Sequence, residues 1–448
     1  MVLLMALSAV PWSSLTGNRL KDFNLFGDLL PGQTPAPAAP ASVEIDPELE
    51  SFIAEAEVEK QTELPAEPVE QSRPEEPAPV SVVDEAPVDD DGDVMFEYYS
   101  ADSLTHFKAA LASEGARVAV IGDSFIEGDI FTQDLRRLLQ DTYGGEGVGY
   151  MSLHSDFPGF RSSVAQSGSG WKMHDLRTFS AHDSLRTLAG EYGRAEGPAH
   201  AGYKGVASRP HLGSWSQSQF LFIAPDSGTV TLTTDAGAVT HSVVPSPDVQ
   251  SLLVDGPTSS LKLDSDIPSL IGLGVYLDGN TGVQVDCMSI RGNSGIGHRR
   301  MNRSLAAQMR HFIDYDLIIL EYGVNALTAE QRDYTAYASA MVSSIERIRS
   351  CYPAADIIVM GIADRGVKQG TEVLSMPTCP AMVKAQRDAA RRTGAVFFDT
   401  RQAMGGDGAA VDWRKRKLMN ADYIHINHDG GRELASIFHR SLSKALNE

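Results

Sequence analysis

Residues 117–124, RVAVIGDS, decide the fold of this chain. The run RVAVIG is apolar without alternation, which is typical of a parallel strand buried on both faces. Residues 129–142 follow it with leucines at helical spacing. A buried strand that leads through a short polar turn into a helix predicts an α/β fold.

The same alternation returns in the second half of the chain. A parallel sheet covered by helices on both faces is therefore predicted. Ligands of such sheets bind beyond the carboxyl ends of the strands, so the polar residues there are the candidates for function. The predicted strands are residues 283–290, 316–321, 356–360 and 395–399, and the predicted helices are residues 299–311, 329–350, 381–393 and 430–446.

The region between these two halves has a different pattern. It contains short strand-like runs separated by Gly and Ser turns, and no helix of convincing period. We therefore predict an all-β insert, a sandwich or jelly roll, over residues 149–281. The α/β domain then comprises residues 94–148 and 282–448.

Acidic residues are concentrated ahead of this domain. Residues 44–97 carry 19 Asp or Glu against Lys60 and Arg73, which accounts for −17 of the formal charge of −21. The rest of the chain is close to neutral, and this excludes nucleic acid as the main partner. Residues 31–93 hold 11 of the 23 prolines and are predicted to form a disordered, acidic, Pro-rich linker.

Residues 1–30 begin with the apolar run VLLMALSAV at residues 2–10. This run is too short to span a bilayer, which takes about 20 residues. It is the tail of a truncated signal or membrane anchor, or an apolar disordered N-terminus. We favour export to the cell envelope, the periplasm in particular, with or without an N-terminal membrane tether.

Three predicted strands end in residues suited to acyl chemistry. Ser124 stands at a strand-to-helix turn, where a helix N-terminus favours developing negative charge. Residues 292–297, GNSGIG, place glycine where a backbone N–H can approach a substrate oxygen, and Asn325 can donate to an oxyanion. Considered one at a time, each also has a purely structural explanation: Ser124 as an N-cap, the glycine-rich run as a tight turn, and Asn325 as a turn residue.

Asp422 and His425 are separated by three residues near the end of the chain. In one turn-like step the carboxylate can orient the imidazole and stabilise its charged form. The alternative is a surface Asp and a His that caps the next helix. His428 lacks an acid three residues before it, and Asp429 is predicted to cap the last helix.

Together, the GDS turn, the glycine after the second strand, the Asn in GVN and the Asp and His in DYIH resemble the SGNH (GDSL-type) hydrolase family. The resemblance implies a flavodoxin-like three-layer α/β/α fold and a serine esterase without metal or organic cofactor. It implies Ser124 as the nucleophile, His425 as the base and Asp422 as its orienting acid. Ser124, Gly295 and Asn325 would form the oxyanion hole.

The stretch GDSFIEGDIFTQDLRRLLQ at residues 122–140, followed by the β insert, is similar to the peptidoglycan O-acetylesterase branch. This resemblance implies an acetylated glycan as substrate, in peptidoglycan or another envelope or dietary polysaccharide. Phe125 stands where that branch often has His, and the oxyanion glycine is Gly295 or Gly297. Glycan O-acetyl transfer and a non-enzymatic glycan-binding protein remain as alternative functions.

Further candidates for substrate contact are Asp123, Met404 and Trp413. Trp171 and Trp215 are weaker candidates, since tryptophans are more often core residues. The cysteines, Cys287, Cys351 and Cys379, are interpreted as three thiols, although a Cys351–Cys379 disulfide is the alternative. Their spacing fits no metal motif.

Overall fold

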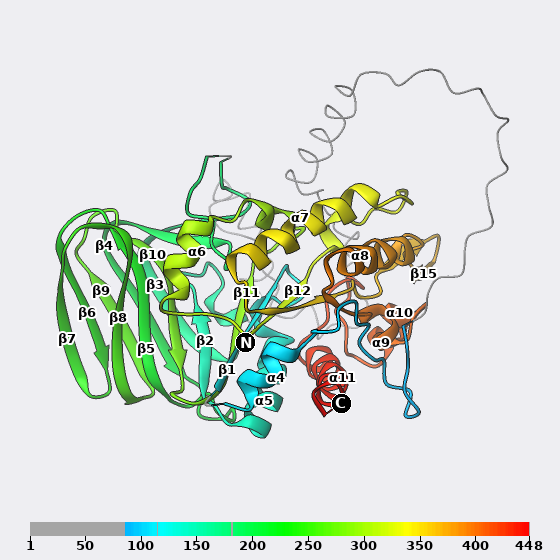
Figure 1. Ribbon diagram of the computed structural model, residues 1–448, viewed down its shortest axis with the longest axis horizontal. Coiled ribbons are helices and arrows are strands. Elements are labelled where there is room, and N and C mark those ends of the chain that lie inside the picture. Colours follow the sequence, from blue (N-terminus) through cyan, green and yellow to red (C-terminus); the bar gives the residue numbers. More distant parts are fainter. Residues whose placement is uncertain (1–85, 114, 181, 448) are drawn as a thin grey trace, which may run out of the picture. The chain divides into compact units, whose positions relative to one another are not determined.

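The computed structural model describes residues 86–113, 115–180 and 182–447. The predictions for residues 1–30, and for the linker up to residue 85, lie outside the described residues. In the described part a five-stranded sheet and a nine-stranded sheet carry most of the structure (Figure 1). None of the helices in that part has the length and apolar character needed to cross a membrane.

The five-stranded sheet is parallel throughout, and β1 lies next to β11 and β12. Gly122 of β1 pairs in register with Ser289 on one side and with Glu321 on the other. The three strands therefore end at the same level, and the loops that follow them meet there. In spatial order the strands are β11 (Gly282–Ser289), β1 (Gly115–Gly122), β12 (Leu317–Glu321), β13 (Asp356–Met360) and β16 (Val396–Phe398).

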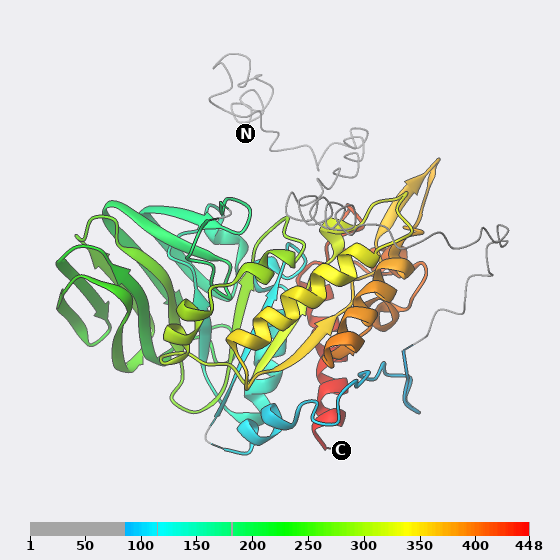
Figure 2. The same ribbon diagram turned by 45° about the horizontal axis from the view of Figure 1, so that its top comes forward.

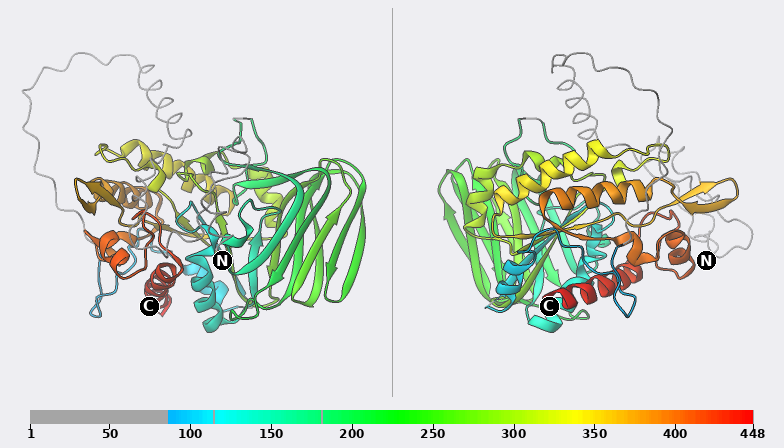
Figure 3. Two further views of the ribbon diagram at one scale, coloured as in Figure 1. Left: turned by 180° about the vertical axis from the view of Figure 1, so that it is seen from behind. Right: turned by 45° about the vertical axis from the view of Figure 1, so that its right-hand side comes forward.

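Alternate residues of β1 enter two different cores. Val118 and Val120 pack with α5 and α11, whereas Ala119 and Ile121 belong to the core under α7 and α8. The two pairs of helices cover opposite faces of the parallel sheet (Figures 2 and 3). The predicted flavodoxin-like three-layer α/β/α fold is confirmed. The helices are α4 (Thr105–Leu111), α5 (Thr132–Tyr143), α6 (Arg303–Arg310), α7 (Thr335–Cys351), α8 (Cys379–Thr393), α9 (Thr400–Met404), α10 (Ala409–Lys415) and α11 (His428–Asn447). Short 3₁₀ turns are η1 (Glu127–Asp129), η2 (Pro158–Phe160), η3 (Ile296–Arg300) and η4 (Val324–Ala326), and β14 (Gly366–Gln369) pairs with β15 (Glu372–Ser375).

The nine-stranded sheet is the predicted all-β insert, and we call it the β module. Strands that are not hydrogen-bonded neighbours share its core: Phe220 of β5 packs in one cluster with Leu232 of β6 and Leu263 of β9. The sheet therefore forms a sandwich around its own core. Its strands are β2 (Gly147–Met151), β3 (Val164–Asp175), β4 (Glu191–Gly205), β5 (Trp215–Ala224), β6 (Gly228–Thr234), β7 (Gly237–Val243), β8 (Ser246–Thr258), β9 (Ser260–Ser265) and β10 (Ile271–Asp278).

The chain enters and leaves the β module side by side. Val283 N–H donates to the Gly144 carbonyl at 2.9 Å, and Gly279 N–H donates to the Glu146 carbonyl at 3.1 Å. Gly282 has φ 76°, and a Cβ there would lie 2.3 Å from the Gly144 carbonyl carbon. Only glycine allows this close approach.

A second surface of the β module packs on the α/β domain. Tyr150, Leu273 and Tyr276 of the module lie in the same apolar cluster as Met288 and Leu305 of the α/β domain. The backbone N–H of Tyr150 also donates to the Asp286 carboxylate of β11 at 2.8 Å. The β module is thus joined to the α/β domain by a shared core.

The described structure differs from the predicted linker at residues 86–93. Ala86 N–H donates to the Gln402 side chain at 2.7 Å, Asp93 pairs with Arg440 of α11 at 2.8 Å, and Lys444 pairs with Asp89. The acidic residues that suggested disorder are neutralised by basic residues far along the chain, which local composition cannot reveal. The three cysteines are buried and free, so the alternative Cys351–Cys379 disulfide is not formed.

Candidate active site

Ser124, His425 and Asp422 lie together at the carboxyl ends of the strands. Ser124 Oγ is 2.8 Å from His425 Nε2, and His425 Nδ1 is 2.8 Å from Asp422 Oδ2. Burial raises the pKa of Asp422, but hydrogen bonds from the His425 ring and from two backbone N–H groups outweigh it and lower the pKa overall. A carboxylate that stays ionised can hold Nδ1 protonated and leave Nε2 to accept the serine proton.

The turn between Asp422 and His425 holds both side chains in place. Asp422 Oδ1 accepts the backbone N–H of Ile424 at 3.0 Å and that of His425 at 3.1 Å. Tyr423 has φ 58°, a left-handed conformation that is rare for a bulky residue, and its carbonyl accepts the Gly366 N–H at 2.8 Å. Hydrogen bonds on both sides of Tyr423 therefore maintain this strained turn.

His428 lies apart from the serine. Its Nδ1 is 3.0 Å from Gln133 Nε2, and it is the first residue of α11. The cap of this helix is Asn427, whose Oδ1 accepts the N–H groups of Asp429 and Gly430, both at 3.0 Å. The predicted cap at Asp429 is wrong, because Asp429 already lies in the first helical turn.

Asp123 supports Asn325 instead of facing a substrate. It is fully buried, and its Oδ2 accepts a hydrogen bond from Asn325 Nδ2 at 2.8 Å, while its Oδ1 accepts one from the Phe125 N–H at 2.9 Å. Asn325 Nδ2 also donates to the Asn293 carbonyl at 3.0 Å. Asp123 is not placed to make the predicted contact with a substrate, because no part of its side chain is exposed.

Gly295 was predicted to offer its N–H to the oxyanion, but in the structure this N–H is already hydrogen-bonded. That N–H donates to Asn293 Oδ1 at 2.6 Å. A glycine is required here because φ is 85° and a Cβ would lie 2.6 Å from the Tyr322 ring. Gly297 is buried inside η3. Both Asn325 and Gly295 thus point their donors at oxygens of Asn293, a residue that the motif analysis did not single out.

Glu321 is a second residue that the sequence analysis missed. It ends β12 and is 1% exposed, and its Oε2 has no hydrogen-bond partner among the described residues. Burial and the neighbouring Asp123 raise the pKa of Glu321 well above its ordinary value. Burial likewise raises the pKa of Asp123 to about 7. The sequence signal that could have identified Glu321 was an acidic residue at the end of the apolar run LIILE, residues 317–321.

Trp413 and Met404 are core residues. Trp413 is 1% exposed and its Nε1–H donates to the Met404 carbonyl at 2.8 Å, while the Met404 side chain is buried in the same cluster. Trp215 is equally buried inside the β module. The predicted substrate contacts by these residues are wrong, since no ligand can reach them without unfolding the core. Trp171, 7% exposed, lines a cavity.

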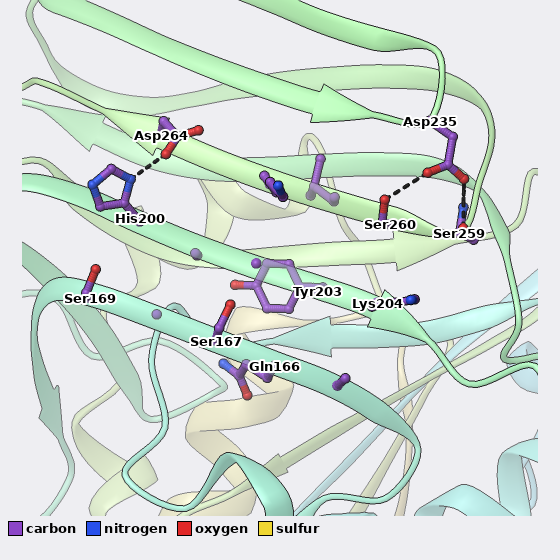
Figure 4. A pocket seen from close by; sticks show the side chains of 16 residues that line it. Gln166, Ser167, Ser169, His200, Tyr203, Lys204, Asp235, Ser259, Ser260 and Asp264 are labelled. Atoms are coloured by element: carbon purple, nitrogen blue, oxygen red, sulfur yellow. Dashed lines mark hydrogen bonds and ion pairs between the residues drawn. The ribbon is translucent and has the colours of Figure 1, made fainter.

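Two hollows of the described structure bear on binding. A cavity of about 460 Å³ lies between the β module and the loops after β1 and β11. A groove of about 660 Å³ crosses β3, β4 and β9, with His200 and Asp264 paired at one end and Asp235 bonded to Ser259 and Ser260 at the other (Figure 4). No set of three or more His, Cys, Asp or Glu side chains in the described ranges is placed to hold a metal ion.

A parallel α/β sheet with a serine, a histidine and a carboxylate hydrogen-bonded at its strand ends has the side-chain arrangement of a serine hydrolase. Residues 270–432, which include Asn325, Asp422 and His425, match the model of the GDSL-like lipase/acylhydrolase family. For this part of the chain the resemblance stated from the motifs is confirmed.

A solved structure shares the fold, and others show a weaker similarity. A structure titled "Peptidoglycan O-acetylesterase in action, 5 min" is 23% identical with a TM-score of 0.65, and the match covers 79% of this chain and 99% of that one. A family two carbohydrate esterase from Cellvibrio japonicus is 11% identical with a TM-score of 0.27, covering 62% and 99%. The search of curated proteins gives no significant match.

Proposed function

We propose that this protein is a serine esterase that removes O-acetyl groups from a cell-envelope glycan, with peptidoglycan as its natural substrate. The observation that carries the proposal is the hydrogen-bonded chain from Ser124 through His425 to Asp422 at the strand ends. A water-hydrolysed acyl enzyme needs a nucleophile, a base and an orienting acid, and these three side chains have that order.

In the proposed reaction, Ser124 Oγ attacks the acetyl carbonyl carbon while His425 Nε2 takes the hydroxyl proton. His425 then gives this proton to the departing sugar oxygen, which leaves an acetyl ester on Ser124. Water attacks that ester with the same histidine as base, and acetate leaves as the Ser124 hydroxyl is restored. Asp422 stabilises the imidazolium in both steps.

Oxyanion binding requires an exchange of hydrogen bonds in this proposal. One N–H of the Asn325 amide would redirect its hydrogen bond from the Asn293 carbonyl to the oxyanion, and Asp123 would hold the amide group in place by accepting from the other N–H. A donor that exchanges a neutral carbonyl for a charged oxygen binds the transition state more strongly than the ground state. Gly295 can contribute its N–H only if the Asn293 side chain turns away.

The fold supports the choice of a glycan. The structure with a TM-score of 0.65 is titled a peptidoglycan O-acetylesterase, and the match extends over 99% of that chain. A glycan of this kind is reached in the cell envelope, and we propose that compartment, the periplasm in particular, as the site of action. Acetyl transfer to another sugar would use the same three side chains.

Acetate release from O-acetylated peptidoglycan and from acetylated xylan tests the proposal. We expect release from peptidoglycan with free acetate as the product, and none with Ser124→Ala. Release from xylan alone would overturn peptidoglycan as the natural substrate. An acetylated sugar formed in place of free acetate would identify a transferase. No release from either polymer, with p-nitrophenyl acetate still hydrolysed, would overturn glycan deacetylation altogether.

A further inference from the structure

The cavity of about 460 Å³, which we call the junction pocket, is lined in part by the residues that follow β1 and β11 in the chain. On the α/β side it is lined by η1 and by residues 287–291, and on the module side by the loop around η2 and by β3 and β4. Glu127 of η1 is three residues past Ser124, and Ile290 N–H donates to the Gly122 carbonyl at 3.0 Å. The pocket therefore adjoins the strand ends where the ester would react.

An aromatic side chain of the β module is presented at this pocket. Phe157 is 65% exposed, and the Arg291 guanidinium lies over its ring, 5.9 Å from the centroid. Phe160 anchors the same loop, because its ring packs so closely on Gly128 that a Cβ there would lie 2.7 Å away. An exposed ring held at a fixed place is what the apolar face of a sugar stacks on.

The pocket also contains polar side chains, and its guanidinium groups, those of Arg161, Arg177 and Arg291, are paired with carboxylates. Arg291 pairs with Glu127 at 2.7 Å, and Arg177 pairs with Asp175 at 2.6 Å. Deeper in the pocket Glu191 accepts a hydrogen bond from Tyr150 at 3.0 Å, and its burial raises its pKa to about 7. Carboxylates and guanidinium groups offer acceptors and donors for hydroxyl groups, while paired charges give an ionic ligand no advantage.

We propose that the junction pocket binds an uncharged sugar residue of the polymer, next to the residue that carries the ester, with Phe157 stacked on its ring. This inference rests on the proposed function. Binding energy from the neighbouring sugar would place the acetyl carbonyl at Ser124 and would act only on polymers, because a small ester cannot reach the pocket and the serine together.

Phe157→Ala tests the proposal by the ratio of kcat/KM on O-acetylated peptidoglycan to kcat/KM on p-nitrophenyl acetate. We expect this ratio to fall about three- to tenfold through a higher KM for the polymer, as loss of one stacking contact implies. Phe157→Trp should keep the ratio. The matched control is Leu253→Ala, an exposed apolar residue of β8 outside the pocket, for which the ratio should stay within about twofold.

The outcomes separate this inference from the proposed function. If wild-type protein deacetylates the polymer and Phe157→Ala leaves the ratio as in the Leu253→Ala control, the pocket assignment is overturned and the esterase assignment stands. If wild-type protein cleaves p-nitrophenyl acetate but no glycan ester, the proposed function itself fails. A fall in the ratio for both variants would also contradict a role specific to Phe157.

Discussion

Two histidines three residues apart have different surroundings, and this difference can be tested by matched substitutions. His425 contacts both Ser124 and Asp422, whereas His428 contacts Gln133. His425→Ala should lower kcat on p-nitrophenyl acetate by at least about 10³-fold, because the nucleophile loses its base. His428→Ala should stay within about threefold of wild type. Steady-state kinetics of the pair decides the assignment, which a reversed order of losses would overturn.

Glu321 makes the stability of the protein depend on pH in a defined direction. Its pKa is raised by burial, so the folded protein keeps a proton that the unfolded chain loses above about pH 4.3. The free energy of unfolding therefore falls as pH rises, by about 1.4 kcal/mol per pH unit while only the folded state is protonated. Glu321→Gln, an isostere of the protonated acid, should remove this loss.

Urea unfolding at a series of pH values between 4.5 and 7 measures the effect. The stability of Glu321→Gln relative to wild type should rise across this range, and the exposed control Glu346→Gln should run parallel to wild type. Parallel curves for Glu321→Gln would mean that the carboxyl is already ionised in the folded protein.

At the scale of single elements, α11 depends on the cap that the sequence analysis misplaced. Asn427 accepts two backbone N–H groups at the start of the helix, while Asp429 pairs with Arg432 on the surface at 2.9 Å. Asn427→Ala should lower the free energy of unfolding by about 1 kcal/mol. Asp429→Ala should change it by less than half as much. Equal effects in thermal unfolding would restore Asp429 as the cap.

The catalytic strands were predictable and several module strands were not. Strands β12 and β13 were placed within one residue, because a buried parallel strand is a continuous apolar run. By contrast β3, VAQSGSGWKMHD, is buried only at Val164 and Trp171, and it is held by pairing with β4 along its whole length. Strands that depend on their neighbours leave little signal in their own sequence.

The site shows the same division. Ser124, His425 and Asp422 were found because three strand ends and a DxxH spacing converge on one chemistry. Asn293 and Glu321 were missed because the neighbours that mark them are distant in sequence: the Asn293 carbonyl accepts from Asn325, and Glu321 lies close to Asp123. Burial also could not be read locally: Trp413 resembled a surface aromatic near the site, but its ring fills the core under α10.

For the whole molecule, the shared core between the β module and the α/β domain implies one folding unit. Tyr150, Leu273 and Tyr276 would all be lost if residues 149–281 were replaced by a short linker, and Met288 and Leu305 of the α/β domain would lose the partners that cover them. Such a deletion removes core as well as any glycan contact. Point substitutions at Phe157 therefore separate binding from stability better than deletion of the module.

A buried ionic cluster joins the two parts and allows this single unit to be tested. Arg117 of β1 pairs with Asp286 of β11 at 2.9 Å and with Asp278, the last residue of β10 in the module. Tyr315 O–H donates to the same Asp286 carboxylate at 2.7 Å. Arg117→Ala leaves two buried carboxylates without their cation, and we expect it to lower the free energy of unfolding by about 3–5 kcal/mol.

The loss of stability in Arg117→Ala should affect the β module and the α/β domain together. In a Trp12→Phe, Trp413→Phe background, fluorescence reports on Trp171 and Trp215 of the β module, while far-UV circular dichroism at helical wavelengths reports on the α/β domain. Both signals should shift to the same lower denaturant midpoint, since coincident transitions are the mark of one cooperative unit. The control Arg137→Ala removes an exposed ion pair with Asp141. With either signal, it should change the free energy of unfolding by no more than about 1 kcal/mol. If Arg117→Ala moved the fluorescence transition and left the circular dichroism transition in place, the β module would unfold independently, and the shared core would not couple it to the catalytic sheet.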